Sequence, residues 1–249
     1  LIILVSLVSF LDVLKSLSNK VRLISHFVAM TIIFYSLNIV EVLSVWFIIV
    51  PYIVSIGIIN VYNFMDGING ITGLYTLTVL GSLLYVNEFL VLFIDKDIII
   101  YPILASIVFL FCNYRKKAKG FAGDVGSISI AFWIVYRLLK LILTTESFVW
   151  LLFLAVYGVE TVGTILHRLY LRENIFKAHR WHLYQILSNE FKIDHRIVSL
   201  LYAILQIVLS LTIFFIYTQY SYIIIFLLIL FPLLCLYLIN FFLLKKLNN

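Results

Sequence analysis

Charged side chains are scarce in this chain of 249 residues: they make up 12% of it, whereas 64% of the residues are hydrophobic. Soluble domains carry about 25% charged residues. A globule of this length with so few polar groups would leave a largely apolar surface in contact with water. The composition therefore excludes a cytosolic enzyme, a disordered tail and a nucleic-acid-binding arm, and it indicates an integral membrane protein in a lipid bilayer.

Cysteine is rare as well. The two cysteines, Cys112 and Cys235, both lie in apolar runs, so the sequence predicts neither a secreted disulfide scaffold nor a thiolate metal site. Linkers and low-complexity tracts are also missing between the apolar runs. The chain therefore reads as one membrane domain over residues 1–249.

Apolar runs separated by short polar breaks predict an all-α, polytopic helical bundle with about eight full spans, since a helix needs about 20 residues to cross a bilayer. These runs are Leu23–Val40, Val42–Ile59, Ile71–Val86, Ile98–Asn113, Ile128–Ile142, Phe148–Leu166, Ile197–Tyr217 and Tyr222–Leu244. A further run, Leu1–Leu11, is too short to cross alone and predicts a partial span. Because it holds the first residue, which is not methionine, we expect that the chain lacks its natural N-terminal helices.

Basic residues gather in alternate loops. If the loop after the partial span faces the cytoplasm, every Lys and Arg except Lys96, Arg137 and Lys140 falls on the cytoplasmic side. The excess of basic residues in cytoplasmic loops of membrane proteins supports this orientation. Arg137 and Lys140 lie towards the outer end of one span, where long side chains are expected to snorkel to the interface.

One polar cluster lies at the inner end of the span that precedes Ile71. Asn60, Asn63 and Asp66 recur every three residues, so in a helix they lie within reach of one another. A carboxylate and two amides supply the hard oxygen ligands that Mg²⁺ accepts. The alternative is a packing face in which these residues mark the water boundary beside Gly67, Gly70 and Gly73, which favour close helix contact.

A second cluster surrounds Asp124, which precedes Gly126 and Ser127 at the start of a predicted span. Ser127 is a suitable N-cap residue, and a helix start exposes backbone N–H groups that favour phosphate. Because Asp124 would repel a bare anion, the combination indicates a metal-bound phosphate. The alternative is a turn containing Asp followed by an ordinary helix cap.

The longest inner loop, His167–Arg196, is also the most basic, and it contains His179, Arg180 and His182. No thiolate or further histidine nearby completes a tetrahedral zinc site. An arginine with two histidine donors suits a diphosphate or a nucleotide better. The alternative, a solvated loop that obeys the positive-inside rule, explains the Lys and Arg residues but not the histidines.

Three segments occur in the order of a known set of signature loops: Asn60–Gly70, Phe121–Ser127 and Ala178–Gln185. Together they resemble the polyprenyl-phosphate N-acetylhexosamine-1-phosphate transferases, glycosyltransferase family 4, over essentially the whole chain. The His-Arg-x-His-x-Tyr-Gln form of the third segment is most similar to bacterial members that initiate O-antigen or capsule synthesis. It departs from the triple histidine of the muramoyl-pentapeptide transferases.

The resemblance implies an enzyme of the bacterial inner membrane whose active site faces the cytoplasm. It implies transfer of a HexNAc 1-phosphate from a UDP-N-acetylhexosamine to undecaprenyl phosphate, with release of UMP and with Mg²⁺ or Mn²⁺ as cofactor, in lipopolysaccharide or capsule synthesis. The residues implied to act are Asp12, Asp66 and Asp124 in catalysis, Asp124, Asp66 and Asn63 in metal binding, and Asn60, Asn63, His179, Arg180 and His182 in substrate binding.

Two features depart from the family pattern. The first family motif carries adjacent aspartates before a stretch similar to Ser16–Leu23, but this chain has Asp12 followed by Val13. The early spans and a Pro-Arg-Gly-Gly-type loop, expected before Leu1, are also missing. An inactive, truncated relic of the family is therefore an alternative, and we expect weak transfer or none from this chain.

A transporter of an anionic metabolite is the alternative from another class. Its binding site would lie near the middle of the membrane, at broken helices. The predicted spans contain few ionisable groups, chiefly Arg137 and Glu160. Glu160 either borders the active site or is a buried carboxylate paired with Arg168 or another neighbour.

Overall fold

The computed structural model describes residues 2–15, 18–42, 44–174 and 181–247, and within these ranges every regular element is a helix. The elements are α1 (Ile2–Lys15), α2 (Asn19–Ser36), α3 (Ile39–Val42), α4 (Val45–Met65), α5 (Ile71–Phe89), α6 (Lys96–Asn113), α7 (Gly123–Thr145), the 3₁₀ helix η1 (Phe148–Leu154), α8 (Ala155–Tyr170), α9 (Leu183–Gln185), the π-helical turn η2 (Ile186–Glu190), α10 (His195–Ile216) and α11 (Tyr222–Leu247). The predicted all-α fold is confirmed.

Six helical segments of the described ranges are long and apolar enough to cross a bilayer, fewer than the eight predicted. They are Trp46–Met65, Lys96–Asn113, Gly123–Thr145, Phe148–Tyr170, His195–Ile216 and Tyr222–Ile239. The two remaining predicted spans form α2 and α5, which are helices of the same bundle but carry more polar residues. The chain is thus a polytopic helical membrane protein.

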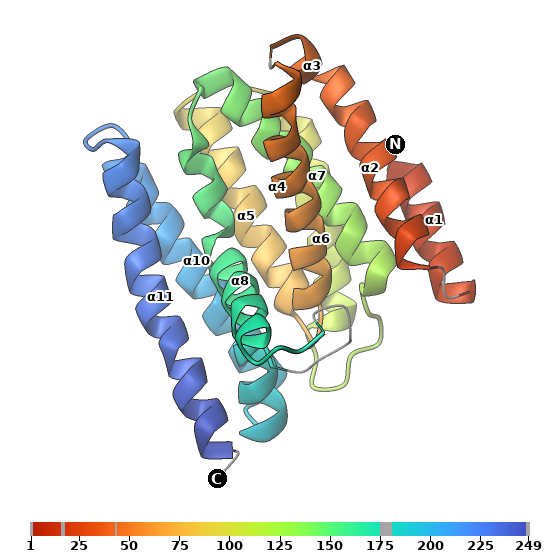
Figure 1. The fold of residues 1–249 in the computed structure, drawn as a ribbon, viewed down its shortest axis with the longest axis vertical. Coiled ribbons are helices and arrows are strands. Elements are labelled where there is room, and N and C mark those ends of the chain that lie inside the picture. The colour runs from red at the N-terminus through yellow and green to blue at the C-terminus, as the bar shows by residue number, and fades with distance from the viewer. Residues whose placement is uncertain (1, 16–17, 43, 175–180, 248–249) are drawn as a thin grey trace.

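Helix α5 shows why a helix inside a membrane bundle need not be strongly apolar. It lies in the middle of the bundle, against α6 and α10 and beside α7 (Figure 1). Its buried side chains include Thr72, Thr76, Thr78 and Ser82. Small and hydroxylated residues favour close contact between helices within membranes, so the composition of α5 suits contact with protein rather than with lipid.

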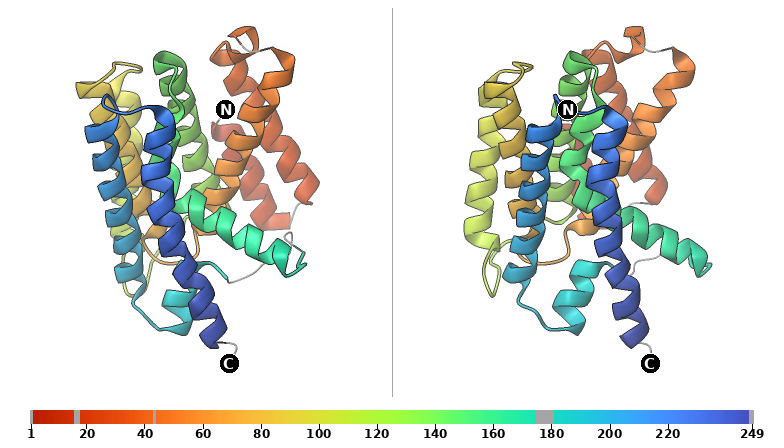
Figure 2. Two further views of the ribbon diagram at one scale, coloured as in Figure 1. Left: turned by 60° about the vertical axis from the view of Figure 1, so that its left-hand side comes forward. Right: turned by 90° about the vertical axis from the view of Figure 1, so that its left-hand side faces the viewer.

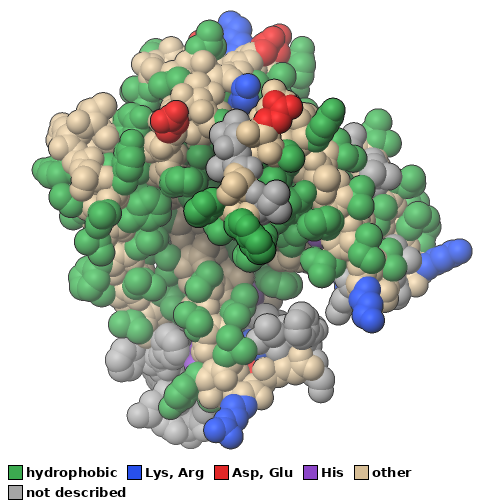
Figure 3. All heavy atoms as spheres, turned by 45° about the horizontal axis from the view of Figure 1, so that its top comes forward, with side chains coloured by type: hydrophobic (Ala, Val, Ile, Leu, Met, Phe, Trp, Pro, Cys, Tyr) green, Lys and Arg blue, Asp and Glu red, His purple; other side chains and the backbone are tan. Residues whose placement is uncertain are grey.

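The outer surface of the bundle is mostly apolar. Large hydrophobic side chains such as Trp46 and Phe47 on α4, Phe111 on α6 and Phe231 on α11 are more than half exposed. Figure 3 shows hydrophobic side chains over most of one face, with charged groups towards its edges. Exposed apolar area of this extent requires a partner, and lipid tails are the partner that the six spans imply.

The span predicted over Phe148–Leu166 is one candidate span, Phe148–Tyr170, built from two consecutive helices. The 3₁₀ helix η1 lies in the bundle, and α8 then leaves it obliquely (Figure 2). This direction carries the second half of α8 towards the end of the bundle where the loops of the predicted motifs lie. The change of direction therefore places α8 beside the candidate site.

Arg137 does not snorkel as predicted. Its side chain is fully buried, donates hydrogen bonds to the carbonyl oxygens of Trp133 and Ile98, and lies 4.1 Å from the centre of the Trp133 ring. Burying a charge is costly unless polar partners replace water. Carbonyl groups of α6 and α7 supply these partners inside the bundle, so the side chain stays there.

Candidate active site

The described parts of the predicted motifs converge at one end of the bundle, the lower end in Figure 1. The Tyr184 hydroxyl donates to the Phe64 carbonyl at 2.9 Å. Asn69, in the loop between α4 and α5, donates to the Arg115 carbonyl at 2.9 Å and accepts a hydrogen bond from Ser199 of α10 at 2.7 Å. Segments far apart in the sequence are therefore held together at this end.

Arg22 joins two of the predicted catalytic carboxylates. Its Nη1 lies 3.2 Å from Asp12 Oδ2 and 3.3 Å from Asp124 Oδ2. The turn between α1 and α2 makes this possible, because Ser18 caps α2 and accepts a hydrogen bond from the Val21 N–H. Arg22 and Asp12 lie in one polar cluster of the sequence, whereas the contact of Arg22 with Asp124 depends on the fold.

Asp124 lies in the first turn of α7 and not in a loop before it. Asn63 Nδ2 donates to Asp124 Oδ1 at 2.8 Å and approaches Ser127 Oγ at 3.2 Å. Ser127 is not the N-cap that was predicted: α7 begins at Gly123, and the Ser127 hydroxyl donates to the Gly123 carbonyl within the helix. Asn63 and Asp124, both predicted to bind metal, are thus in direct contact.

Asp66 is the C-cap residue of α4. Its carboxylate accepts a 2.6 Å hydrogen bond from the Thr72 hydroxyl and another from the backbone N–H of Gly123. Burial, with a smaller contribution from the nearby charge of Asp124, raises the pKa of Asp66 to about 6 against the lowering effect of the two hydrogen bonds. A cation between Asp66 and Asp124 would relieve the repulsion between these carboxylates.

Asn60 lies farther from this cluster. Its Nδ2 donates to the carbonyl of Ile56 on its own helix at 2.9 Å. Asn60 precedes Asp66 by six positions, which corresponds to a rise of about 9 Å along a helix axis. A role of Asn60 in substrate binding stays a prediction.

The third predicted motif is described only in part, because His179 and Arg180 lie outside the described residues. His182 is buried, and its Nδ1 lies 3.3 Å from Thr164 Oγ1 and 4.0 Å from Glu160 Oε1. The His182 ring stacks on Tyr184, with 5.7 Å between the ring centres. The Tyr184 hydroxyl is hydrogen-bonded to the last turn of α4. His182 is therefore connected, through Tyr184, to the segment that carries Asp66.

Glu160 has neighbours other than Arg168, its suggested partner. Arg168 Nε pairs with Glu173 Oε2 at 3.0 Å. Glu160 accepts hydrogen bonds from the Tyr184 N–H and the Tyr202 hydroxyl. No periodicity connects positions 160, 184 and 202, so the sequence offered no signal for this buried cluster.

The side-chain oxygen atoms of Asp66, Asp124 and Asn63 are suitable ligands for Mg²⁺ that is bound together with a substrate. Among the residues that the structure describes, no three His, Cys, Asp or Glu side chains gather as a preformed metal site. Mg²⁺ commonly takes only one or two carboxylates and completes its shell with water and substrate phosphates. Asp66 and Asp124, with the amide oxygen of Asn63, supply a set of that kind.

A hollow of about 810 Å³ adjoins the cluster and runs between α5, α6 and α7. Asp124 and Gly123 line it together with apolar side chains such as Phe109 and Trp133. Val13, which stands where the family motif carries its second aspartate, also lines this hollow and is 65% exposed. An acidic side chain at position 13 would therefore face the same space as Asp124.

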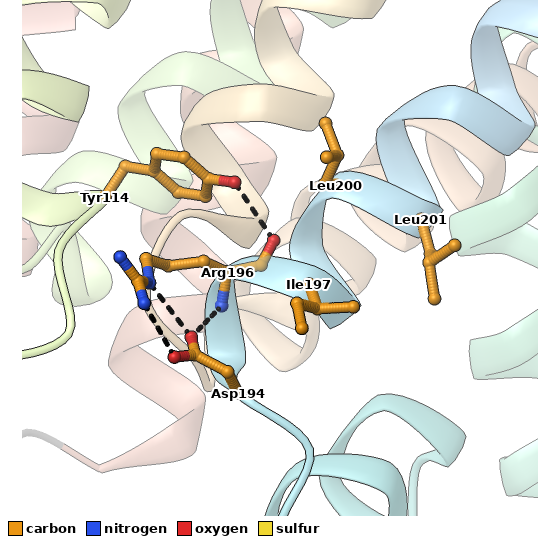
Figure 4. Close-up of a pocket in the computed structure, with 6 residues that line it drawn as sticks. All are labelled: Tyr114, Asp194, Arg196, Ile197, Leu200 and Leu201. Carbon is orange, nitrogen blue, oxygen red and sulfur yellow. Dashed lines mark hydrogen bonds and ion pairs between the residues drawn. The ribbon is translucent and has the colours of Figure 1, made fainter.

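A second hollow lies at the start of α10 and does not resemble a binding site (Figure 4). Its charged groups are Asp194 and Arg196, which pair with each other at 2.8 Å. The hydrogen bond from Arg196 holds the pKa of Asp194 well below its usual range. With both charges satisfied locally, this hollow has little to offer a charged ligand.

Part of the chain matches a known protein family. A family profile described as "Glycosyl transferase family 4" matches residues 1–142, and no curated protein matches the chain. The matched part contains Asp12, Arg22, Asn63, Asp66 and Asp124 and covers more than half of the chain. It indicates a membrane-bound sugar-phosphate transferase with a lipid-linked acceptor. The chain belongs to glycosyl transferase family 4.

Proposed function

We propose that the protein transfers a HexNAc 1-phosphate from a UDP-N-acetylhexosamine to undecaprenyl phosphate and releases UMP, with Mg²⁺ or Mn²⁺ as cofactor. The reaction would start O-antigen or capsule synthesis at the cytoplasmic face of a bacterial inner membrane. The single observation that carries the proposal is the contact of Asn63 and Arg22 with Asp124, with Asp66 beside it. Three separate helices and one loop place these groups at one end of the bundle.

The chemistry requires charge neutralisation more than a strong base. The second pKa of a phosphate monoester is about 6, so the lipid phosphate is largely a dianion at neutral pH. One of its oxygens attacks the β-phosphorus of the UDP-sugar, and the bond from the β-phosphorus to the bridging oxygen breaks as UMP leaves. Both reactants are anions, and phosphoryl transfer depends mainly on positioning and electrostatic stabilisation.

The side chains of the cluster suit these tasks. Asp66, Asp124 and the amide oxygen of Asn63 would hold the divalent ion, which supplies positive charge next to the diphosphate. Arg22, which contacts Asp12, would hold the acceptor phosphate. We assign His182, with His179 and Arg180, to the diphosphate or the uridine of the donor.

Radiolabel transfer tests the proposal. The purified chain in detergent would receive undecaprenyl phosphate and a panel of UDP-HexNAc donors, with and without EDTA. We expect slow label transfer to lipid and equal UMP release for at least one donor, lost in EDTA and restored by Mg²⁺. Absence of transfer from every donor, also in the Val13→Asp variant described next, would overturn the proposal. A transporter would not release UMP. UMP release that depends on both substrates would therefore identify the protein as an enzyme.

Val13→Asp should increase transfer. The change restores the pair of adjacent carboxylates at a position that faces the hollow beside Asp124. Because the Val13 side chain is 65% exposed, the substitution should change stability by no more than about 0.5 kcal/mol. We expect about a tenfold higher rate, which corresponds to about 1.4 kcal/mol in the barrier.

Leu14→Asp is the matched control for Val13→Asp. Leu14 is 62% exposed on the same helix, α1, so the control adds the same charge one residue away. We expect no gain from Leu14→Asp. An equal effect of the two variants on the transfer rate would show that position 13 has no special role.

A further inference from the structure

Glu160 is a carboxylate buried within the protein at the end of the bundle that holds the candidate site. Its side chain is 3% exposed. Oε1 accepts the Tyr184 N–H at 3.1 Å, and Oε2 accepts the Tyr202 hydroxyl of α10. A buried charge lowers stability unless its surroundings compensate for the lost water. The placement of this carboxylate therefore calls for an explanation beyond packing.

The carboxylate of Glu160 holds the start of the helical segment formed by α9 and η2. His182 is the N-cap residue of this segment, and the first N–H groups of a helix have no partner within the helix. Glu160 accepts the Tyr184 N–H, and the Leu183 N–H also points to it. A residue of α8 thus caps a helix 23 residues later in the chain, which fixes the position of the described part of the third motif.

Helix α8 also sets the orientation of the His182 ring. Nδ1 faces α8, at 4.0 Å from Glu160 Oε1 and 3.3 Å from Thr164 Oγ1. Thr164 lies one turn after Glu160 and is itself 2.7 Å from the Tyr237 hydroxyl of α11. With Nδ1 turned to α8, the geometry of the imidazole directs Nε2 to the opposite side.

Tyr184 extends the connection from Glu160 to the acidic cluster. Glu160 bonds the main chain of Tyr184, while the Tyr184 hydroxyl donates to the carbonyl of Phe64 in the last turn of α4. The Tyr184 ring lies against Gly67, the residue after Asp66. One buried carboxylate is thereby connected to both His182 and the backbone next to Asp66.

We propose that Glu160 is a positioning residue. It holds the donor-binding segment around His182 at the correct position relative to Asp66 and Asp124. The inference rests on the proposed function, because it concerns the same site. Glu160 acts through His182 and Tyr184 and does not touch the reactants. Its loss should weaken use of the nucleotide donor and leave the lipid acceptor nearly unaffected, which a general loss of packing would not do.

Glu160→Gln tests this proposal in the whole chain, in detergent. Glutamine keeps the shape of the side chain and still accepts one N–H, but it removes the charge beside His182. We expect the KM for the UDP-HexNAc donor to rise about tenfold, the effect of about 1.4 kcal/mol, and the KM for undecaprenyl phosphate to stay within about twofold. Amide hydrogen exchange of Leu183 and Tyr184 should accelerate by about the same factor.

A double-mutant cycle with His182→Ala shows whether the effect passes through His182. If it does, the two substitutions together should raise the donor KM little more than His182→Ala alone, because residues in one network are not additive. Full additivity of the two effects would overturn the role assigned to Glu160.

Arg137→Gln is the control for a buried charge lost elsewhere. Arg137 is fully buried and hydrogen-bonds α6 and α7 away from the third motif. We expect this variant to lower the unfolding temperature without changing the donor KM. A wild-type donor KM in Glu160→Gln, or a donor KM raised equally in both variants, would overturn the inference. Absence of transfer from both the wild-type chain and Val13→Asp would overturn the proposed function alone, since hydrogen exchange needs no turnover.

Discussion

Asp124→Asn will reduce sugar-phosphate transfer by at least about 100-fold, as expected when a group that stabilises charge in the transition state is lost. The substitution removes the charge that we assign to the divalent ion. It preserves the side-chain shape, and its amide oxygen can still accept the 2.8 Å hydrogen bond from Asn63. The loss should therefore reflect metal and phosphate handling, not misfolding.

The stability of Asp124→Asn should stay close to that of the wild type. Its main structural loss is the 3.3 Å ion pair with Arg22, and the Asp124 side chain is 31% exposed. Pairs of this kind are worth about 0–1 kcal/mol. Arg22 retains its contact with Asp12. Thermal unfolding in detergent checks this expectation before any activity is compared.

Binding of Mn²⁺, followed by electron paramagnetic resonance, and transfer at saturating Mg²⁺ are the two measurements for Asp124→Asn. Asp194→Asn is the matched control, because Asp194 also pairs with an arginine but lies in the hollow at the start of α10 (Figure 4). We expect the control to bind Mn²⁺ and transfer sugar phosphate as the wild type does. Wild-type transfer by Asp124→Asn would refute the metal assignment.

The apolar pattern predicted most helices because contact with lipid leaves a strong signal in the sequence. The span expected over Ile197–Tyr217 is α10, His195–Ile216. The apolar pattern did not predict helix boundaries correctly where protein surrounds the helix or where glycine residues interrupt the apolar run. Helix α7 begins five residues before the predicted Ile128, and in this added turn Asp124 and Ser127 contact Asn63 of α4. That shift moves Asp124 from a loop into a helix.

The candidate site was predictable only in part. The spacing of Asn63 and Asp66 on one predicted helix, and the family motif around Asp124, predicted that these three residues bind one metal ion. The bridge through Arg22 was not predictable, because it depends on a turn that brings Arg22 to a residue 102 positions away. Glu160 was noticed as an isolated acidic residue, but its partners come from two other elements, α9 with its N-cap residue and α10, which only tertiary packing brings to α8.

Gly67→Ala should damage both stability and transfer. A Cβ atom at position 67 would overlap the Tyr184 hydroxyl and lie 2.9 Å from ring carbon Cε2. The ring cannot move aside freely, because its hydroxyl is bonded to the Phe64 carbonyl and its main chain to Glu160. Overpacking of this kind costs about 1–3 kcal/mol. We expect transfer to fall roughly 100-fold, as misplacement of a site by about 1 Å can cause.

Gly57→Ala is the matched control, because Gly57 lies on α4, the helix that ends shortly before Gly67, and an added Cβ there meets no atom within 4 Å. It should keep wild-type stability and transfer. Adding Tyr184→Ala to Gly67→Ala removes the overlap, so the unfolding temperature should partly recover. Transfer should not recover, because the connection from Glu160 through Tyr184 to the end of α4 is then lost. Recovery of both quantities would mean that Tyr184 only fills space, whereas their separation would show that it aligns the third motif with Asp66.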